Sequence, residues 1–256
     1  MRRQGQLLGV EGRPLVLGHR GASAEAPENT MAAFELALEQ GADGFELDVW
    51  RCASGEVVVH HDADTRRTAG EAMSLTGSSL LALRQLDVGV LKSERFRGQR
   101  IPLLEEVLEA LPEAFVNVEM KSNGLPDLRL AGEVARLLER TGASARCLVS
   151  SFDPLLLAAL RFKAPDVATG YLFEARPNWW AREAISTRLL RPRAVHPPFE
   201  LVTPARFERW RRRGLEVNVW TVDTWEEAER LGRLGVASLI TNRPAAVKAA
   251  LNASTS

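Results

Sequence analysis

The sequence contains little cysteine and carries no net charge. Only Cys52 and Cys147 occur among 256 residues, too few for a disulfide framework and without the spacing of a metal site, so we expect buried, reduced thiols. Lysine plus arginine and aspartate plus glutamate both total 33, and the isoelectric point is about 6.9. Because no overall field favours nucleic acid or an acidic membrane, any anion site must be local.

Long apolar runs are also missing. No stretch approaches the roughly 18 apolar residues of a membrane span, and residues 1–14 carry arginines without the apolar core of a signal peptide. The densest basic run, Arg209–Arg213, lies at a predicted helix end, where it suits a solvated face. We therefore expect a cytoplasmic protein with no nucleic-acid partner and no stable membrane anchor. The sequence leaves the oligomeric state open.

Short apolar runs alternate with helical patterns along the whole chain. The predicted strands are Leu15–Gly18, Gly44–Val49, Phe115–Met120, Arg146–Ser150, Ala168–Leu172, Ala194–His196, Glu216–Thr221 and Ser238–Thr241. Eight such units in about 250 residues predict one domain over residues 1–256, an α/β fold closed into a (β/α)8 TIM barrel. An open doubly wound sheet is the alternative, but no Gly-x-Gly-x-x-Gly turn follows the first strand.

Helix signals separate the predicted strands. The predicted helices are Thr30–Gln40, Leu104–Leu111, Leu128–Arg140, Pro154–Lys163, Trp179–Leu189, Pro204–Arg213, Trp225–Leu234 and Ala245–Leu251. Asn29 is a candidate N-cap for the first of them.

One segment breaks the alternation. Residues 57–62 predict an extra short strand close after the second one, and residues 62–101 then contain only a weak helical pattern. A loop this long is usually functional. We expect an insertion at about 62–101 that covers the barrel mouth, with a surface decoration as the alternative.

Three carboxylates occupy inward-facing positions of the predicted strands. Glu46 and Asp48 share one face of the second strand, and Glu119 shares a face of the third with Lys121. An oxygen-only cluster favours Mg2+, Ca2+ or Mn2+ over zinc. In the alternative, Lys121 and Arg20 neutralise the cluster without a metal.

Two histidines and an arginine border the same predicted strand ends. His19 and Arg20 end the first strand, while His60 and His61 lie at the end of the extra one and must face opposite ways. A pair of histidines can act as general base and general acid, and an arginine fork fits phosphate oxygens. Later strand ends add the candidates Ser150–Asp153, His196–Pro197, Val219–Asp223 and Thr241–Pro244. Barrel enzymes place their active sites at this end of the strands.

These motifs together resemble those of the glycerophosphodiester phosphodiesterases. The matching segments are His19–Gly21, Pro27–Thr30, Gly41–Val49, His61–Asp62, Gln99–Leu108, Val118–Lys121, Ser151–Asp153, Val219–Asp223 and Thr241–Pro244. The chain departs from the usual family pattern at Cys52–Gly55 and at His61–Thr65, which leaves the shape of the pocket rim undefined.

The resemblance implies roles for eight residues. It implies that His19 and His61 are the acid–base pair, that Glu46, Asp48 and Glu119 bind a divalent cation (Mg2+ or Ca2+, or else Mn2+), that Arg20 and Lys121 face the phosphate, and that Trp220 lies near the substrate alcohol. The implied reaction cleaves a small-molecule glycerophosphodiester into sn-glycerol 3-phosphate and an alcohol. Which histidine is the acid and which is the base stays open. So does the source of the attacking oxygen, which is either water or the substrate's own glycerol.

Two other functions fit part of the pattern. A barrel that binds polar ligands without catalysis would not need both histidines. A two-carboxylate glycosidase would need neither the histidines nor a metal.

Overall fold

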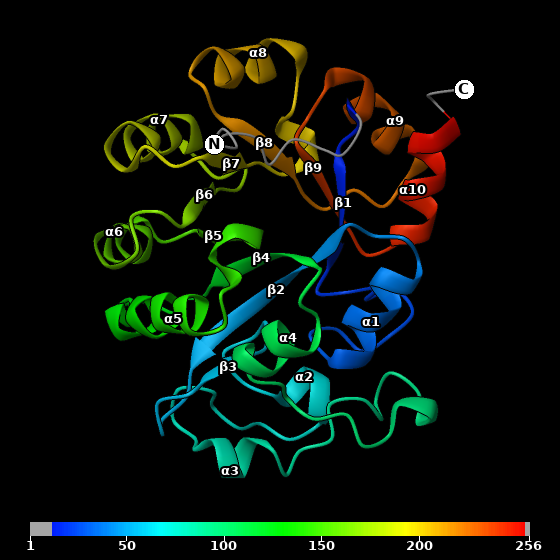
Figure 1. The fold of residues 1–256 in the computed structure, drawn as a ribbon, viewed down its shortest axis with the longest axis vertical. Helices are drawn as coiled ribbons and strands as arrows, with labels where there is room; N and C mark the ends of the chain where they lie inside the picture. Colours follow the sequence, from blue (N-terminus) through cyan, green and yellow to red (C-terminus); the bar gives the residue numbers. More distant parts are fainter. Residues whose placement is uncertain (1–11, 254–256) are drawn as a thin grey trace.

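Parallel strands pair in a closed ring, and helices surround them (Figure 1). The structure is a computed structural model, and it describes residues 12–253. The strands are β1 (Leu15–His19), β2 (Gly44–Arg51), β3 (Val57–Val59), β4 (Phe115–Met120), β5 (Cys147–Ser151), β6 (Ala168–Leu172), β7 (Ala194–His196), β8 (Glu216–Val219) and β9 (Ser238–Thr241). Their order is β1-β9-β8-β7-β6-β5-β4-β2-β3, and β1 also pairs with β2.

The pairing of β1 with both β9 and β2 closes the sheet. The predicted barrel is therefore confirmed, and the open doubly wound sheet is wrong. Only β3 pairs antiparallel, on the outer part of β2, as a short hairpin within the described residues. The largest strand error lies in β3, which ends at Val59, three residues before the predicted end. Next come β2, which continues two residues past its predicted end, and β8, which stops two residues before it.

Seven of the predicted helices lie between strands and an eighth follows β9, each with both ends within two residues of its predicted range. They are α1 (Met31–Glu39), α4 (Leu104–Ala110), α5 (Leu128–Arg140), α6 (Pro154–Lys163), α7 (Trp179–Leu190), α8 (Pro204–Arg212), α9 (Trp225–Leu234) and α10 (Pro244–Ala253). The expected N-cap of α1 is wrong: Thr30 caps the helix by accepting from the Ala33 N–H, while the Asn29 side chain donates to Asp48 at 2.8 Å.

The main core lies between the outer face of the barrel and the helices. Every residue of β5 and β9 is buried, as expected for strands covered on both faces. On α5, Leu130, Val134 and Leu138 repeat at helical spacing and are buried in this core. Burying each such side chain contributes about 1.5–3 kcal/mol, so packing of one helix face holds each helix on the barrel.

The insertion has a small core of its own. It contains α2 (Arg66–Ala69), α3 (Leu80–Leu83) and the short 3-10 helix η2 (Glu94–Phe96), and it packs Leu75, Leu83 and Ile101 against Trp50 and Val58 of the β2–β3 hairpin. In Figure 1 it lies beside this hairpin. Two further short 3-10 helices, η3 (Ala143–Arg146) and η4 (Phe199–Leu201), precede β5 and α8.

The arginines of the basic run at the end of α8 are all exposed, as predicted, but two of them also reach a buried partner. Arg209 and Arg213 pair with Glu183 of α7, which is completely buried. Arg211 and Arg212 pair instead with Glu208 of their own helix. Half of the run therefore holds two helices together.

Both cysteines are buried free thiols, as expected. No helix within residues 12–253 is long and apolar enough to cross a membrane. The prediction for residues 1–14 and the ends of the predicted 1–256 domain fall largely outside the described range.

Candidate active site

Three carboxylates converge at the carboxyl end of the barrel. Glu46 and Asp48 lie two residues apart on β2, and Glu119 on β4 is opposite Asp48 in the strand register. Because residues two apart share a strand face, all three side chains point into the barrel. All three are buried, and their ligand oxygens lie within 4.8 Å of one another. The structure thus brings the predicted metal ligands together.

Two cations serve these three carboxylates. The Lys121 Nζ lies 2.7 Å from a Glu119 oxygen and 3.2 Å from an Asp48 oxygen, and the Arg20 Nε lies 3.4 Å from the other Asp48 oxygen. Glu46 accepts a backbone N–H of Arg20 at 3.0 Å and forms no ion pair within the described residues. The alternative of a cluster neutralised by Arg20 and Lys121 therefore leaves one negative charge uncompensated.

Burial shapes the protonation of this cluster. Burial and the neighbouring charges of Asp48 and Glu119 raise the pKa of Glu46 well above its ordinary value. Burial also raises the pKa of Glu119, against the opposing charge of Lys121. For Asp48, the charges of Lys121 and Arg20 outweigh burial and lower the pKa. A buried unpaired charge is costly, and a divalent cation among these oxygens would remove that cost, so the residues fit such an ion.

His19 is the last residue of β1, and Arg20 begins the loop that leads to α1. The Nδ1 atom of His19 is 2.8 Å from the Oδ1 atom of Asn242. Burial, with a smaller effect of the Arg20 charge, lowers the pKa of His19 to about 4. The ring is therefore neutral near pH 7 and able to accept a proton.

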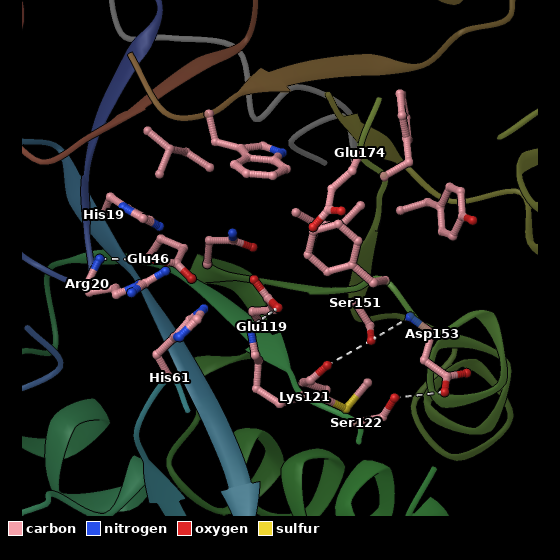
Figure 2. Close-up of a pocket in the computed structure, with 18 of the residues that line it drawn as sticks. His19, Arg20, Glu46, His61, Glu119, Lys121, Ser122, Ser151, Asp153 and Glu174 are labelled. Atoms are coloured by element: carbon pink, nitrogen blue, oxygen red, sulfur yellow. Dashed lines mark hydrogen bonds and ion pairs between the residues drawn. The ribbon is translucent and has the colours of Figure 1, made fainter. Parts of the chain in front are cut away.

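His61 follows β3 and approaches the carboxylates from another side (Figure 2). Its Nδ1 is 2.7 Å from an oxygen of Asp62. Burial lowers its pKa, while the charge of Asp48 opposes that shift. The neighbouring His60 faces away and is buried, with its ring nitrogens 2.9 Å from the Asp62 carbonyl and 2.9 Å from the Thr68 hydroxyl. Of the two, His61 lines the cavity.

A cavity of about 450 Å³ connects these groups. Its lining contains seven of the eight residues named in the sequence analysis: His19, Arg20, Glu46, His61, Glu119, Lys121 and Trp220. Trp220 is fixed there because its indole N–H donates to the His196 carbonyl at 2.8 Å, and its ring meets Phe152 edge-on at 5.8 Å. The eighth residue, Asp48, lies beneath the surface of the cavity and contacts Lys121.

The far wall of the cavity was not predicted. It comes from the end of β6 and the loop into α7, and it contains Tyr171, Phe173, Glu174, Arg176 and Trp179. Figure 2 shows Glu174 across the cavity from His19 and His61. The sequence signal was weak, since only the position of Glu174 just beyond a strand end pointed to the site. This wall, and no residue of 62–101, borders the cavity, so the expectation that the insertion covers the mouth is wrong.

The insertion instead braces the side of the barrel that carries Arg20 and His61. Arg67 of α2 donates to Asp62 at 2.7 Å and to Glu28 at 2.6 Å, and Glu28 pairs with Arg20 at 3.0 Å. One arginine thereby connects the partner of His61 to the partner of Arg20. No local motif marks Arg67, because Glu28 lies 39 residues away in the chain.

The other strand-end candidates from the sequence analysis differ in whether they line the cavity. Ser151 and Asp153 line the cavity. His196 does not, because it is completely buried inside the barrel, where its Nε2 accepts from the Asn218 amide at 2.9 Å. Asn117 was missed, although it shares a strand face with Glu119: it lines the cavity, and its buried Oδ1 has no partner among the described residues.

Comparison with known proteins agrees with this geometry. Residues 19–246 match the model of the glycerophosphoryl diester phosphodiesterase family. The chain is 34% identical over 239 residues to a glycerophosphodiester phosphodiesterase of Caldanaerobacter subterraneus subsp. tengcongensis, with 91% of this chain and 95% of the relative covered.

Two solved structures of 26–27% identity share the fold. One is a phosphodiesterase of Oleispira antarctica in complex with the product sn-glycerol-3-phosphate, with a TM-score of 0.86, 26% identity, and coverage of 94% of this chain and 97% of that one. The other is a glycerophosphodiester phosphodiesterase from Agrobacterium tumefaciens, with a TM-score of 0.78, 27% identity, and coverage of 92% and 99%.

Proposed function

This chain belongs to the glycerophosphoryl diester phosphodiesterase family and is a phosphoric diester hydrolase, and we propose that it cleaves glycerophosphodiesters to sn-glycerol 3-phosphate and an alcohol with the help of a divalent cation. The observation that carries this proposal is the charge balance of the site. Three buried carboxylates, Glu46, Asp48 and Glu119, share two cations beside a cavity large enough for a small phosphodiester.

The three carboxylates would hold the cation. Their oxygens suit Mg2+, Ca2+ or Mn2+. Glu46 supports such an ion, because it has no ion-pair partner among the described residues, and burial and its acidic neighbours raise its pKa. When bound, the cation would supply Lewis acidity toward a phosphoryl oxygen. The chelation experiment below tests which of these three metals restores hydrolysis.

Two cationic side chains face the cavity beside the carboxylates. A phosphodiester carries one negative charge, and more develops as phosphorus becomes five-coordinate. Arg20 and Lys121, which line the cavity, offset this charge where it forms. Their contacts with Asp48 keep both side chains oriented toward the reacting group.

The two histidines exchange the protons of the reaction. One takes a proton from the attacking oxygen, and the other gives a proton to the leaving oxygen. His19 and His61 line the cavity from two sides of the carboxylates, and each has its Nδ1 occupied, by Asn242 and by Asp62. Each ring therefore turns its Nε2 toward the reacting groups. The indole ring of Trp220 offers an apolar surface against which the alcohol can pack.

Support for the substrate comes from a relative of similar fold. The Oleispira phosphodiesterase binds sn-glycerol-3-phosphate as product, and the cavity here has the cations to hold the same group. A small molecule is therefore the proposed partner, and a cytoplasmic location and the absence of a nucleic-acid partner remain proposals from composition.

A chelation experiment tests the function. Protein treated with excess EDTA should lose hydrolysis of glycerophosphocholine, glycerophosphoethanolamine, glycerophosphoglycerol and glycerophosphoinositol, and added Mg2+, Ca2+ or Mn2+ should restore it. A lysophospholipid and a glycoside in the same panel test the neighbouring activities. Full hydrolysis after chelation would contradict the metal, hydrolysis of only the glycoside would favour the glycosidase, and binding without turnover would favour the non-catalytic barrel.

A further inference from the structure

The side chain of Asn117 is buried beside the cavity without a hydrogen-bond partner. Asn117 lies on β4, is only 2% exposed, and lines the cavity. Its buried Oδ1 has no partner among the described residues. Leaving a buried polar group unsatisfied lowers the stability of a folded protein. A ligand that enters the cavity and bonds this amide would remove that cost.

The two other buried asparagines of the described chain have partners on both sides of the amide. Asn29 donates to the Asp48 carboxylate at 2.8 Å and accepts from the Asp48 backbone N–H at 3.3 Å. Asn218 donates to His196 at 2.9 Å and accepts from the Ser238 hydroxyl at 2.8 Å. Neither of the two lines the cavity. Burial alone therefore does not account for the unpaired amide at the cavity.

Asn117 also lies deeper in the barrel than the metal-ligand candidate on its own strand. It precedes Glu119 by two residues on the same face of β4, so its Cα lies about 7 Å further from the strand end. Its register partner on β2 is Glu46. The far wall of the cavity is open by comparison, because the side chains of Glu174 and Arg176 are 39% and 71% exposed. The cavity thus has an enclosed inner end and an open outer end.

The two halves of a glycerophosphodiester differ in the same way. The glycerol phosphate half is constant, whereas the alcohol varies in size, so the enclosed end suits the glycerol. Glycerol carries two free hydroxyls on adjacent carbons, and each can donate and accept. The Asn117 amide offers donors and an acceptor side by side. No hydrogen bond within the described chain fixes its orientation, so either its oxygen or its NH2 group can turn toward a hydroxyl.

We propose that Asn117 binds the glycerol half of the substrate by hydrogen bonding its two free hydroxyls at the inner end of the cavity. The inference rests on the proposed function and deepens it, because it gives the direction of binding: the glycerol points inward, and the alcohol points toward Glu174. The alternative is that Asn117 orients Glu46 as a metal ligand. Glu46 accepts from the Arg20 backbone N–H at 3.0 Å and receives no hydrogen bond from Asn117.

Calorimetric binding of two phosphate monoesters tests the inference. The ligands are sn-glycerol 3-phosphate and n-propyl phosphate, which has the same phosphate and chain length but no free hydroxyl, and the buffer contains Mg2+. Asn117→Leu removes the amide at similar volume. It should weaken binding of sn-glycerol 3-phosphate about 10-fold, as expected for one or two lost hydrogen bonds, and leave binding of n-propyl phosphate unchanged. An equal loss for both ligands, or no loss for either, would overturn the inference.

This outcome is separable from the proposed function. A protein that hydrolyses the glycerophosphodiester panel, but whose Asn117→Leu variant keeps the preference for sn-glycerol 3-phosphate, retains the function and loses the inference. An unmodified protein that neither hydrolyses the panel nor binds sn-glycerol 3-phosphate would overturn both.

Asn218→Leu is the matched control, since it makes the same change at a buried asparagine that does not line the cavity. Without ligand, it should lower Tm because it leaves His196 and Ser238 unpaired, whereas Asn117→Leu should be at least as stable as the unmodified protein. The preference of Asn218→Leu for sn-glycerol 3-phosphate should be unchanged. A clear loss of Tm in Asn117→Leu would show that the amide has a structural role and would overturn the inference.

Two further measurements separate glycerol binding from metal binding and from a folding failure. Added Mg2+ should change the Tm of Asn117→Leu and of the unmodified protein equally, and a smaller change in the variant would assign Asn117 to the metal site instead. In NMR spectra of the unmodified protein, the side-chain NH2 signals of Asn117 should shift with sn-glycerol 3-phosphate but not with n-propyl phosphate. Equal shifts would overturn the inference even if the variant does not fold.

Discussion

Two buried clusters use the same residue types and balance charge in opposite ways. At the barrel mouth, Glu46, Asp48 and Glu119 share the cations of Lys121 and Arg20. Between α7 and α8, a single carboxylate, Glu183, receives two arginines. The first cluster has an excess of negative charge, and the second has an excess of positive charge.

The second cluster is fully satisfied by the protein. Each oxygen of Glu183 accepts from one arginine, Arg213 at 2.8 Å and Arg209 at 2.6 Å, and Thr187 lies 3.2 Å from the first. Glu183 is 0% exposed, whereas the side chains of Arg209 and Arg213 are 50% and 32% exposed. Water solvates the surplus positive charge, so this cluster needs nothing further and connects two helices.

The difference separates a structural cluster from a functional one. Extra positive charge on long side chains can reach water, but extra negative charge on short carboxylates inside a barrel cannot. The first cluster therefore fits an added cation, and it adjoins a cavity in which that cation would meet a substrate. Three experiments test this contrast, and a fourth tests a buried residue, His196, that belongs to neither cluster.

Removing the positive charge of Lys121 from the first cluster should have the largest effect on turnover. Lys121→Met keeps most of the stem and removes the charge, so turnover should fall about 10²–10³-fold in a folded protein. Turnover should fall more than substrate binding, since charge grows on the phosphate toward the transition state. Lys248→Met, which breaks a pair with Asp43 before β2, is the control. A folded Lys121→Met protein with normal kcat would contradict the assignment.

A bound metal ion should reverse which of two proteins is the more stable, the unmodified protein or the Glu46→Gln variant. Mg2+, Ca2+ or Mn2+ at a hundredfold excess over its Kd should stabilise the unmodified protein by about 3 kcal/mol. Without cation, Glu46→Gln should be the more stable protein because it relieves repulsion, and with cation it should be the less stable. Thermal unfolding with EDTA or with cation measures both. The same order under both conditions would refute the metal site.

Neutralising the second cluster should cost stability and spare turnover. Glu183→Gln leaves Arg209 and Arg213 without their charged partner, so the free energy of unfolding should drop by about 2–3 kcal/mol. The kcat per folded molecule should stay unchanged, and added cation should not alter the loss. Urea unfolding and steady-state kinetics measure the two quantities. A fall in kcat without a stability loss would place this cluster in the functional class instead.

His196 gives the smallest expected effect, through pH. Burial lowers its pKa to about 3, from an ordinary value of 6.5. Because the unfolded chain takes up this proton first as pH falls, stability is present above pH 6.5 and is lost progressively between 6.5 and about 3. From pH 7 to pH 5 the unmodified protein should lose about 2 kcal/mol more than His196→Asn. Denaturant unfolding at the two pH values measures this difference. Equal losses in the free energy of unfolding for the two proteins would show that the folded ring titrates normally.

The sequence predicted local features well. Apolar runs placed eight parallel strands, and the two-residue alternation put Glu46, Asp48, Glu119 and Lys121 on inward faces. These inferences need only neighbours in the chain. Features that depend on distant contacts were missed, including the far wall of the cavity around Glu174 and the brace formed by Arg67.

The misassigned N-cap of α1 shows the same limit. Asn29 is a good cap by local propensity, but its amide donates to Asp48, which lies 19 residues away, so Thr30 caps the helix instead. The basic run at α8 shows a related limit, because its arginines are solvated as predicted but no local pattern reveals that Arg209 and Arg213 also pair with Glu183 of α7. In both cases a partner from a distant part of the chain supplies what local preference does not encode.

The sequence by itself determined the strand and helix order, the inward carboxylates and the histidines beside them, because each follows from spacing along the chain. Only the tertiary structure decided which charges remain uncompensated and which nitrogen of His19 faces the cavity. Asn242 lies 223 residues from His19 and reaches it only because β1 pairs with β9. Closure of the barrel brings the first and last strands together, and no local pattern encodes the hydrogen bonds that form across that seam.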